Sequence, residues 1–275
     1  MTDEQLLEVI QETVESKAAV LDLGRKDLST LPPDIGRLTW LKSLDLSDNK
    51  LSSLPPEITH LKNLTHLFLS GNKLTTLPLE ITQLTNLTHL FLSDNQLALL
   101  PPEIARLTQL EVLYLSHNWI NSLPEEICQL TSLAELDLDD NQLAELPPQI
   151  FRLTSLRHLF VNDNQLTELS PEIAQLNQLT SLNLCGNQLT SLPPEFFWLT
   201  RLEWLYLGKN HLTILPPEIC QLTELEHLSL DGNLLVSPPL WIARKGIDAV
   251  RQYFGALFTR ELREEAREHF LEYHW

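Results

Sequence analysis

The sequence contains few cysteines, few basic residues and no long apolar run, and each scarcity excludes a class of protein. Three cysteines are an odd and small number, so they do not predict a disulfide framework. No window approaches ~18 uninterrupted apolar residues, so no transmembrane helix is predicted. The N-terminal residues lack a basic stretch followed by an apolar one, which is the pattern of a signal peptide. We therefore expect a soluble, cytoplasmic protein.

The charge of the chain is strongly one-sided. It has 19 lysine and arginine residues against 37 aspartate and glutamate residues, which gives a formal net charge of −18. Nucleic acids and anionic membranes are polyanions, so neither is expected as a partner. The chain also lacks the G-x-x-x-x-G-K-[ST] motif, so no phosphate-binding loop is predicted.

What the chain does contain is a sequence repeat of constant length. Leucine recurs at one fixed interval at Leu41, Leu64, Leu87, Leu110, Leu133, Leu156, Leu179, Leu202 and Leu225, and Ala18 extends the series by one unit. The unit reads L-x-x-L-x-L-x-x-N-x-L-x-x-L-P-x-x-I-x-x-L-x-x, without insertion or deletion. Ten such units predict a repeat architecture.

Each part of the unit predicts one structural element. The L-x-L segment alternates sides as a short strand does, and strands of successive units stack as a parallel sheet. The asparagine that follows can satisfy the backbone groups of a buried turn. The proline segment, followed by an acid in most units, predicts a short helix or 3₁₀ turn on the other side. The predicted fold is an α/β solenoid, or horseshoe, with a parallel sheet on its concave face and helical caps.

Three segments are predicted from these patterns. Residues 1–17 form an N-terminal capping helix with an apolar stripe, and Thr2 with Gln5 predicts a capping box. Residues 18–245 hold the ten repeats. Residues 246–275 form a C-terminal helical cap, whose apolar positions are Ile247, Val250, Phe254, Leu257, Phe258, Leu262, Phe270 and Leu271. A docking helix for a partner is the alternative for this last segment.

The unit resembles the intracellular leucine-rich repeats of Ras-group-related proteins and bacterial Roco-type proteins. The segment from Ser237 to Ile247 is similar to the one that leads from such repeats into a GTPase domain. The resemblance implies protein–protein interaction in signalling. Because the phosphate-binding motif is missing, the GTPase activity is not carried over.

The outward positions of each strand carry the information on function, because the repeat itself leaves them variable. We predict that the chain is a protein-binding scaffold, not an enzyme, and that it uses no cofactor. The predicted partner-binding residues on the concave face are His66, Phe68, His89, Phe91, Tyr114, His117, Glu135, Asp137, Asp139, Asp140, His158, Phe160, Asp163, Trp204 and Tyr206. Exposed rings on a rigid sheet favour a binding surface, although stacking that merely stabilises the sheet is an alternative.

The acids around Asp137 predict a partner with a basic segment beside an apolar anchor. Two alternative functions stay open: a regulatory module of a Roco-like GTPase system, and a metal- or pH-responsive binder that uses His66, His89 and His158. Cys128 and Cys220 lie four repeats apart, about 20 Å, which is too far for a disulfide. Neither the partner's identity nor the oligomeric state is predicted.

Overall fold

A computed structural model describes residues 1–272, with side chains described as far as residue 259. Its centre is one parallel sheet of ten three-residue strands in chain order. The strands are β1 (Val20–Asp22), β2 (Ser43–Asp45), β3 (His66–Phe68), β4 (His89–Phe91), β5 (Val112–Tyr114), β6 (Glu135–Asp137), β7 (His158–Phe160), β8 (Ser181–Asn183), β9 (Trp204–Tyr206) and β10 (His227–Ser229). Every strand pairs with the next in a register of one repeat unit, so equivalent positions of successive units stand side by side.

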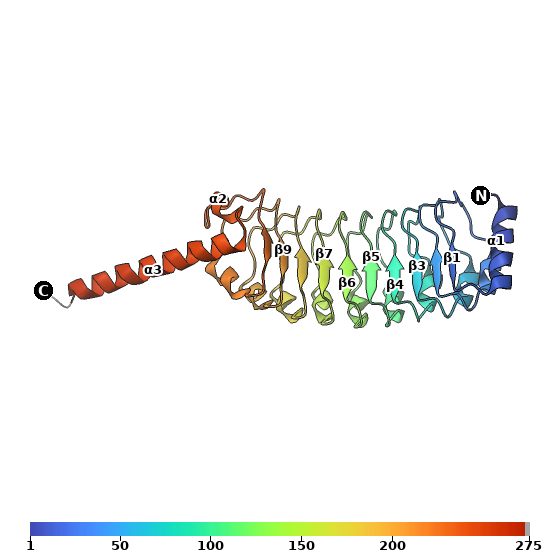
Figure 1. The fold of residues 1–275 in the computed structure, drawn as a ribbon, viewed down its shortest axis with the longest axis horizontal. Helices are drawn as coiled ribbons and strands as arrows, with labels where there is room; N and C mark the ends of the chain where they lie inside the picture. Colours follow the sequence, from blue (N-terminus) through green and yellow to red (C-terminus); the bar gives the residue numbers. More distant parts are fainter. Residues whose placement is uncertain (273–275) are drawn as a thin grey trace.

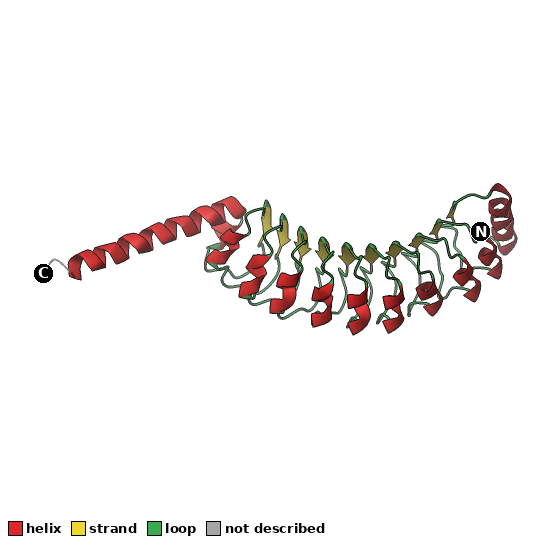
Figure 2. Ribbon diagram, turned by 90° about the horizontal axis from the view of Figure 1, so that it is seen from below, coloured by secondary structure: helices red, strands yellow, loops and turns green. Residues whose placement is uncertain are grey.

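The return segments form 3₁₀ helices, as the proline and acid pattern predicts. They are η1 (Pro33–Arg37), η2 (Pro56–His60), η3 (Leu79–Gln83), η4 (Pro102–Arg106), η5 (Glu125–Gln129), η6 (Pro148–Arg152), η7 (Pro171–Gln175), η8 (Pro194–Trp198) and η9 (Pro217–Gln221). Figure 2 shows that the strands line the inner side of a curved array and the helices its outer side. The predicted α/β solenoid with a parallel sheet on its concave face is confirmed.

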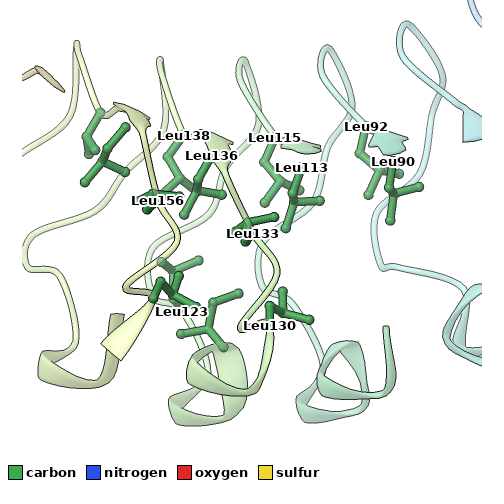
Figure 3. Packing of buried hydrophobic residues seen from close by; sticks show 14 of the residues in the cluster. Leu90, Leu92, Leu113, Leu115, Leu123, Leu130, Leu133, Leu136, Leu138 and Leu156 are labelled. Atoms are coloured by element: carbon green, nitrogen blue, oxygen red, sulfur yellow. The ribbon is translucent and has the colours of Figure 1, made fainter. Parts of the chain in front are cut away.

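The core fills the space between the sheet and the 3₁₀ helices. Leu113, Leu136 and Leu138 point inward from the sheet side, and Leu130 packs beneath them from the helix side (Figure 3). All four side chains are fully buried. Burial of such side chains stabilises a fold by roughly 1.5–3 kcal/mol each, which makes leucine the main source of the solenoid's stability.

The asparagine ladder, which comprises Asn49, Asn72, Asn95, Asn118, Asn141, Asn164, Asn187, Asn210 and Asn233, satisfies the turns behind the strands. Asn141 is typical: its Nδ2 donates to the carbonyls of Leu115, Leu138 and Asp139 at 3.0–3.1 Å. Its Oδ1 accepts the N–H of Ile120 at 2.9 Å. Each amide therefore links its own coil, which is one repeat unit, to the preceding coil.

Helices stand at both ends of the array (Figure 1). α1 (Asp3–Ser16) buries Leu6 and Ile10 against the first repeat, and Thr2 with Gln5 forms the predicted capping box. At the other end come α2 (Leu240–Ala243) and α3 (Ile247–Glu272). α3 buries Ile247, Val250 and Phe254.

Beyond these first turns, α3 continues away from the repeats (Figures 1 and 2). Phe258 is 63% exposed. Leu262, Phe270 and Leu271 lie outside the residues whose side chains are described, and residues 273–275 lie outside the described chain. Among the described residues, no helix is both long enough and apolar enough to cross a membrane.

Candidate functional site

The concave face presents two rows of side chains, one from the first and one from the third residue of each strand. The parallel register sets His66 beside His89, and Phe68 beside Phe91. Phe91 in turn lies beside Tyr114. The middle residue of each strand points into the core, so these two rows are the part of the sheet that a partner can reach.

Rings on β3, β4 and β5 form a continuous ladder. Phe68 stacks on Phe91 with centroids 4.6 Å apart and planes only 2° from parallel. Phe91 meets Tyr114 edge-on at 5.1 Å. All three side chains stay partly exposed. The rings therefore support one another and still offer an apolar surface, so the two interpretations of the sequence are compatible.

The histidines of the other row form a second, shorter stack. The rings of His66 and His89 lie 4.3 Å apart and 12° from parallel. The Nδ1 atoms of His66 and His89 lie 2.9 Å from the hydroxyls of Thr65 and Thr88, respectively. Burial, reinforced by the neighbouring His66, holds the pKa of His89 below its ordinary value. The stacked pair therefore adds flat ring surface beside the ladder.

Tyr114 connects the ladder to the acidic coil of β6. Its hydroxyl donates to Oε1 of Glu135 at 2.5 Å. Burial, followed by this hydrogen bond, raises the pKa of Tyr114. The tyrosine is therefore a neutral donor, and the bond fixes both side chains at the boundary between rings and acids.

Four aspartates gather where β6 and β7 end. Oδ1 of Asp137 accepts the N–H of Asp139 at 3.0 Å, and Oδ1 of Asp139 accepts the N–H of Asn162 at 2.7 Å. Burial raises the pKa of Asp139 to about 7, and the charges of Asp137, Asp140 and Asp163 add to the shift. The carboxylates repel one another, so a cation placed over them is favoured.

The position that holds Asp140 and Asp163 is constrained by the backbone as well as by charge. Its residues in all ten units have φ between 49° and 79°. Glycine, asparagine and aspartate adopt this left-handed conformation at the lowest cost. The position therefore carries a conformational constraint that the sequence analysis did not predict. The one histidine here is His117, whose Nδ1 lies 3.4 Å from Oδ2 of Asp140.

The remaining predicted residues form two separate groups. His158 and Phe160 on β7 contact each other edge-on at 6.3 Å. Trp204 and Tyr206 on β9 form the second group, and β8 stands between them and β7.

His227, which the sequence did not single out, stacks on Trp204 with centroids 3.6 Å apart. Its place in the same column, next to Trp204, is the signal that could have identified it.

The geometry gives little support to metal binding. Among the residues that the structure describes, no group of three or more histidines, cysteines or acids could hold a metal ion. Cys128, Cys185 and Cys220 are all free thiols.

Comparison with protein families identifies the repeat. A model described as "Leucine rich repeat" matches residues 16–74, 39–97 and 177–235. Two further models, "Leucine-rich repeat region" and "Leucine Rich repeats (2 copies)", match residues 102–166 and 154–195. No curated protein sequence matches the chain significantly.

Several solved structures are similar in sequence and fold. A leucine-rich-repeat protein of Leptospira interrogans is 40% identical with a TM-score of 0.73, over 82% of this chain and 64% of that one. The ectodomain of a plant membrane receptor kinase from Arabidopsis thaliana, in complex with a Casparian strip integrity factor, is 38% identical with a TM-score of 0.69. It is matched over 78% of this chain and 27% of its own.

A third structure holds a peptide. The Arabidopsis receptor kinase HAESA, in complex with a peptide hormone and a co-receptor, is 28% identical with a TM-score of 0.71. The match covers 80% of this chain and 39% of that one. The chain thus spans less than two thirds of each of these proteins.

Proposed function

Since the chain belongs to the leucine-rich repeat family, we propose that it is a scaffold that binds a segment of a partner protein on its concave face, between β3 and β7. One observation carries the proposal: the partly exposed ring ladder ends directly at a cluster of carboxylates, joined through Tyr114 and Glu135. Rings and unbalanced charge side by side are a typical centre of a protein interface.

The chemistry of the partner follows from this juxtaposition. A lysine or arginine side chain would lie over Asp137, Asp140 and Asp163, while an apolar side chain would pack on the rings of Phe91 and Tyr114. The similar structures support a protein partner, because two of them are receptor kinases in complex with an integrity factor or a peptide hormone. As part of the same proposal we assign the scaffold to intracellular signalling. The three cysteines, all within the described residues, form no disulfide, which supports a reducing compartment.

The test is a comparison of two charge reversals. The concave variant carries Asp137→Lys with Asp140→Lys, and the control carries Glu103→Lys with Glu126→Lys in the 3₁₀ helices of the convex side. Both variants change the net charge equally, so general electrostatic effects cancel. Proteins from extracts of the source cells should bind to the wild type and the control and be lost from the concave variant.

Salt provides the second measurement. A basic partner should dissociate as the salt concentration rises, because screening weakens its attraction to the carboxylates. A partner that binds the concave variant as well as the wild type would contradict the proposed site. Fractionation of source cells with an antibody against the chain tests the intracellular assignment separately.

A further inference from the structure

The third residues of the strands form a row in which most strands from β3 to β9 carry a ring. Two strands in this range carry none, and we call these two positions the missing rungs. Phe68, Phe91 and Tyr114 are the rings on β3, β4 and β5, and Phe160 and Tyr206 are those on β7 and β9. Between them, β6 carries Asp137 and β8 carries Asn183. Phe160 therefore stands alone between two positions that have no ring.

The first missing rung, on β6, is acidic. Asp137 stands beside Tyr114 along the sheet, and the phenol of Tyr114 donates to Glu135 on the same strand as Asp137. Asp137, Asp140 and Asp163 all lie close enough to Asp139 for their charges to raise its pKa. A positively charged side chain fits here, because its charge balances the carboxylates and its carbon chain can lie along the rings of Tyr114 and Phe160.

The second missing rung, on β8, is small and uncharged. Ser181 and Asn183 are the two outward residues of this strand, and Gly186 follows at the turn. On one side stand His158 and Phe160, and on the other Trp204 and Tyr206. Both outward positions of β8 are thus bordered by rings on both neighbouring strands.

The spacing of the rings sets the size of the side chain that a bound partner, here called the guest, can place over β8. Phe68 and Phe91 show that rings on adjacent strands stack at 4.6 Å on this sheet. Phe160 and Tyr206 lie two strands apart, roughly 9.6 Å. One ring above Asn183 would stand one rung from each, so the position fits a single aromatic side chain.

The distance between the two missing rungs selects the conformation of the guest chain. β6 and β8 are two strands apart, so the guest's charged and aromatic side chains must emerge from one face of its backbone roughly 9.6 Å apart. An extended β-strand offers about 6.6 Å or about 13 Å on one face, because its side chains alternate. A polyproline II helix offers residues i and i+3 on one face at about 9.3 Å, which matches.

We propose that the concave face binds a polyproline II segment that places a basic residue on β6 and an aromatic residue on β8, with two residues between them. The inference rests on the proposed function, since it assumes that this face binds protein. It goes further by naming the backbone conformation, the spacing and the second binding position, which lies outside the ladder of β3 to β5.

Synthetic peptides test the spacing directly. Acetylated and amidated peptides would carry one arginine and one tyrosine, separated by one, two or three prolines and flanked by prolines, in both chain orders. Calorimetry with the full chain should show that the two-proline spacing, in one of the two orders, binds about fivefold more tightly than either other spacing. Equal affinities at all spacings, or no binding of any peptide, overturn the inference.

Variants that place an aromatic residue on β8, at the second missing rung, provide the matched test. Asn183→Phe should weaken the two-proline peptide at least about fivefold. The matched control is Ser229→Phe, which adds the same ring to the same row on β10, two strands beyond β8, and should change the affinity little. Circular dichroism checks that each variant folds, and Ser181→Phe replaces Asn183→Phe if that variant does not.

Undiminished binding by a folded variant with the added ring contradicts the inference. The proposed function is judged separately, by the charge reversals at Asp137 and Asp140 and a protein partner. A partner that fails to bind the charge-reversal variant can still bind Asn183→Phe as well as it binds the wild type. This result would support the proposed scaffold function and contradict the second binding position.

Discussion

The asparagine ladder and the ring ladder run in parallel through the same coils, yet they differ in every respect that matters for function. The asparagines are buried, and each repeats the same bonds to the coil before it. The rings are partly exposed and change from strand to strand, with acids on β6 and small side chains on β8. The asparagine is constant because the buried backbone groups of every turn need hydrogen-bond partners. The residues of the ring ladder vary because the fold does not dictate the exposed side chains of the sheet.

The largest expected effect falls on the buried ladder. Asn141→Ala removes the partners of the Ile120 N–H and of three carbonyls. Because unsatisfied buried groups are expensive, the free energy of unfolding should fall by about 3 kcal/mol or more. Chemical denaturation measures it. The control is Asn183→Ala on the concave face, which removes two partly buried hydrogen bonds, from the Cys185 N–H and to Oδ1 of Asn162, and should cost only about 1–2 kcal/mol. Equal losses would erase the contrast between the ladders.

A smaller effect is expected within the ring ladder. Phe91→Ala removes a ring that stacks on Phe68 and meets Tyr114, so the unfolding free energy should fall by about 2 kcal/mol. Phe160→Ala should cost about 1 kcal/mol less, because Asp137 and Asn183 flank Phe160 along the sheet. If both variants lose the same stability, stacking along the sheet contributes nothing.

The third prediction concerns pH. Burial raises the pKa of Asp139 to about 7, so the folded protein retains this proton to a higher pH than the unfolded chain, in which the group titrates near its ordinary value of 3.8. Ionisation of Asp139 therefore lowers stability as pH rises through that window, and the loss is complete above it.

Asp139→Asn removes this ionisation and retains an acceptor for the Asn162 N–H. Relative to the wild type, the variant should gain about 1 kcal/mol at pH 8, after allowance for solvent screening, and nothing at pH 4. Denaturation at both pH values provides the measurement. A gain that is the same at both pH values would show that burial and the neighbouring charges do not disfavour the ionised carboxylate of Asp139.

The smallest effect is expected at the position where all ten units have a positive φ. Substitutions there distinguish the conformational requirement of the backbone from the effect of charge. Asp94 has φ of 55°, so Asp94→Gly should alter stability by only a few tenths of a kcal/mol. Asp94→Val should cost about 1 kcal/mol or more, because a β-branched residue is strained there. Thermal unfolding of the two variants tests this. Tolerance of valine would return this position to the freely variable surface.

The sequence was sufficient to predict the fold because each consensus position has one physical task. Leu136 must fill the core, Asn141 must satisfy a buried turn, and Pro148 must begin a return helix, so their spacing alone specified the solenoid. The capping box of Thr2 and Gln5 was equally local and was predicted correctly.

The site was less predictable because its properties arise between coils. Sequence showed that Tyr114 and Glu135 share a face, but not that their side chains bond. It could not show that Asp139 is half-buried, or that β8 separates two groups of rings, because both depend on neighbours a whole repeat away along the chain. The left-handed backbone at Asp140 was missed for a different, local reason: aspartate is favoured by this conformation, but it was interpreted from its charge alone.

The unbroken register of one repeat unit per strand has a genetic consequence. Because Asn141 bonds only to its own coil and the one before it, an in-frame duplication or deletion of one repeat would leave every junction chemically equivalent. A gene of this kind can lengthen or shorten its product by unequal recombination while the coils still fit together. Such an event would move the rings and acids relative to one another in whole steps of one strand, so new partners could arise by changing the order of existing coils.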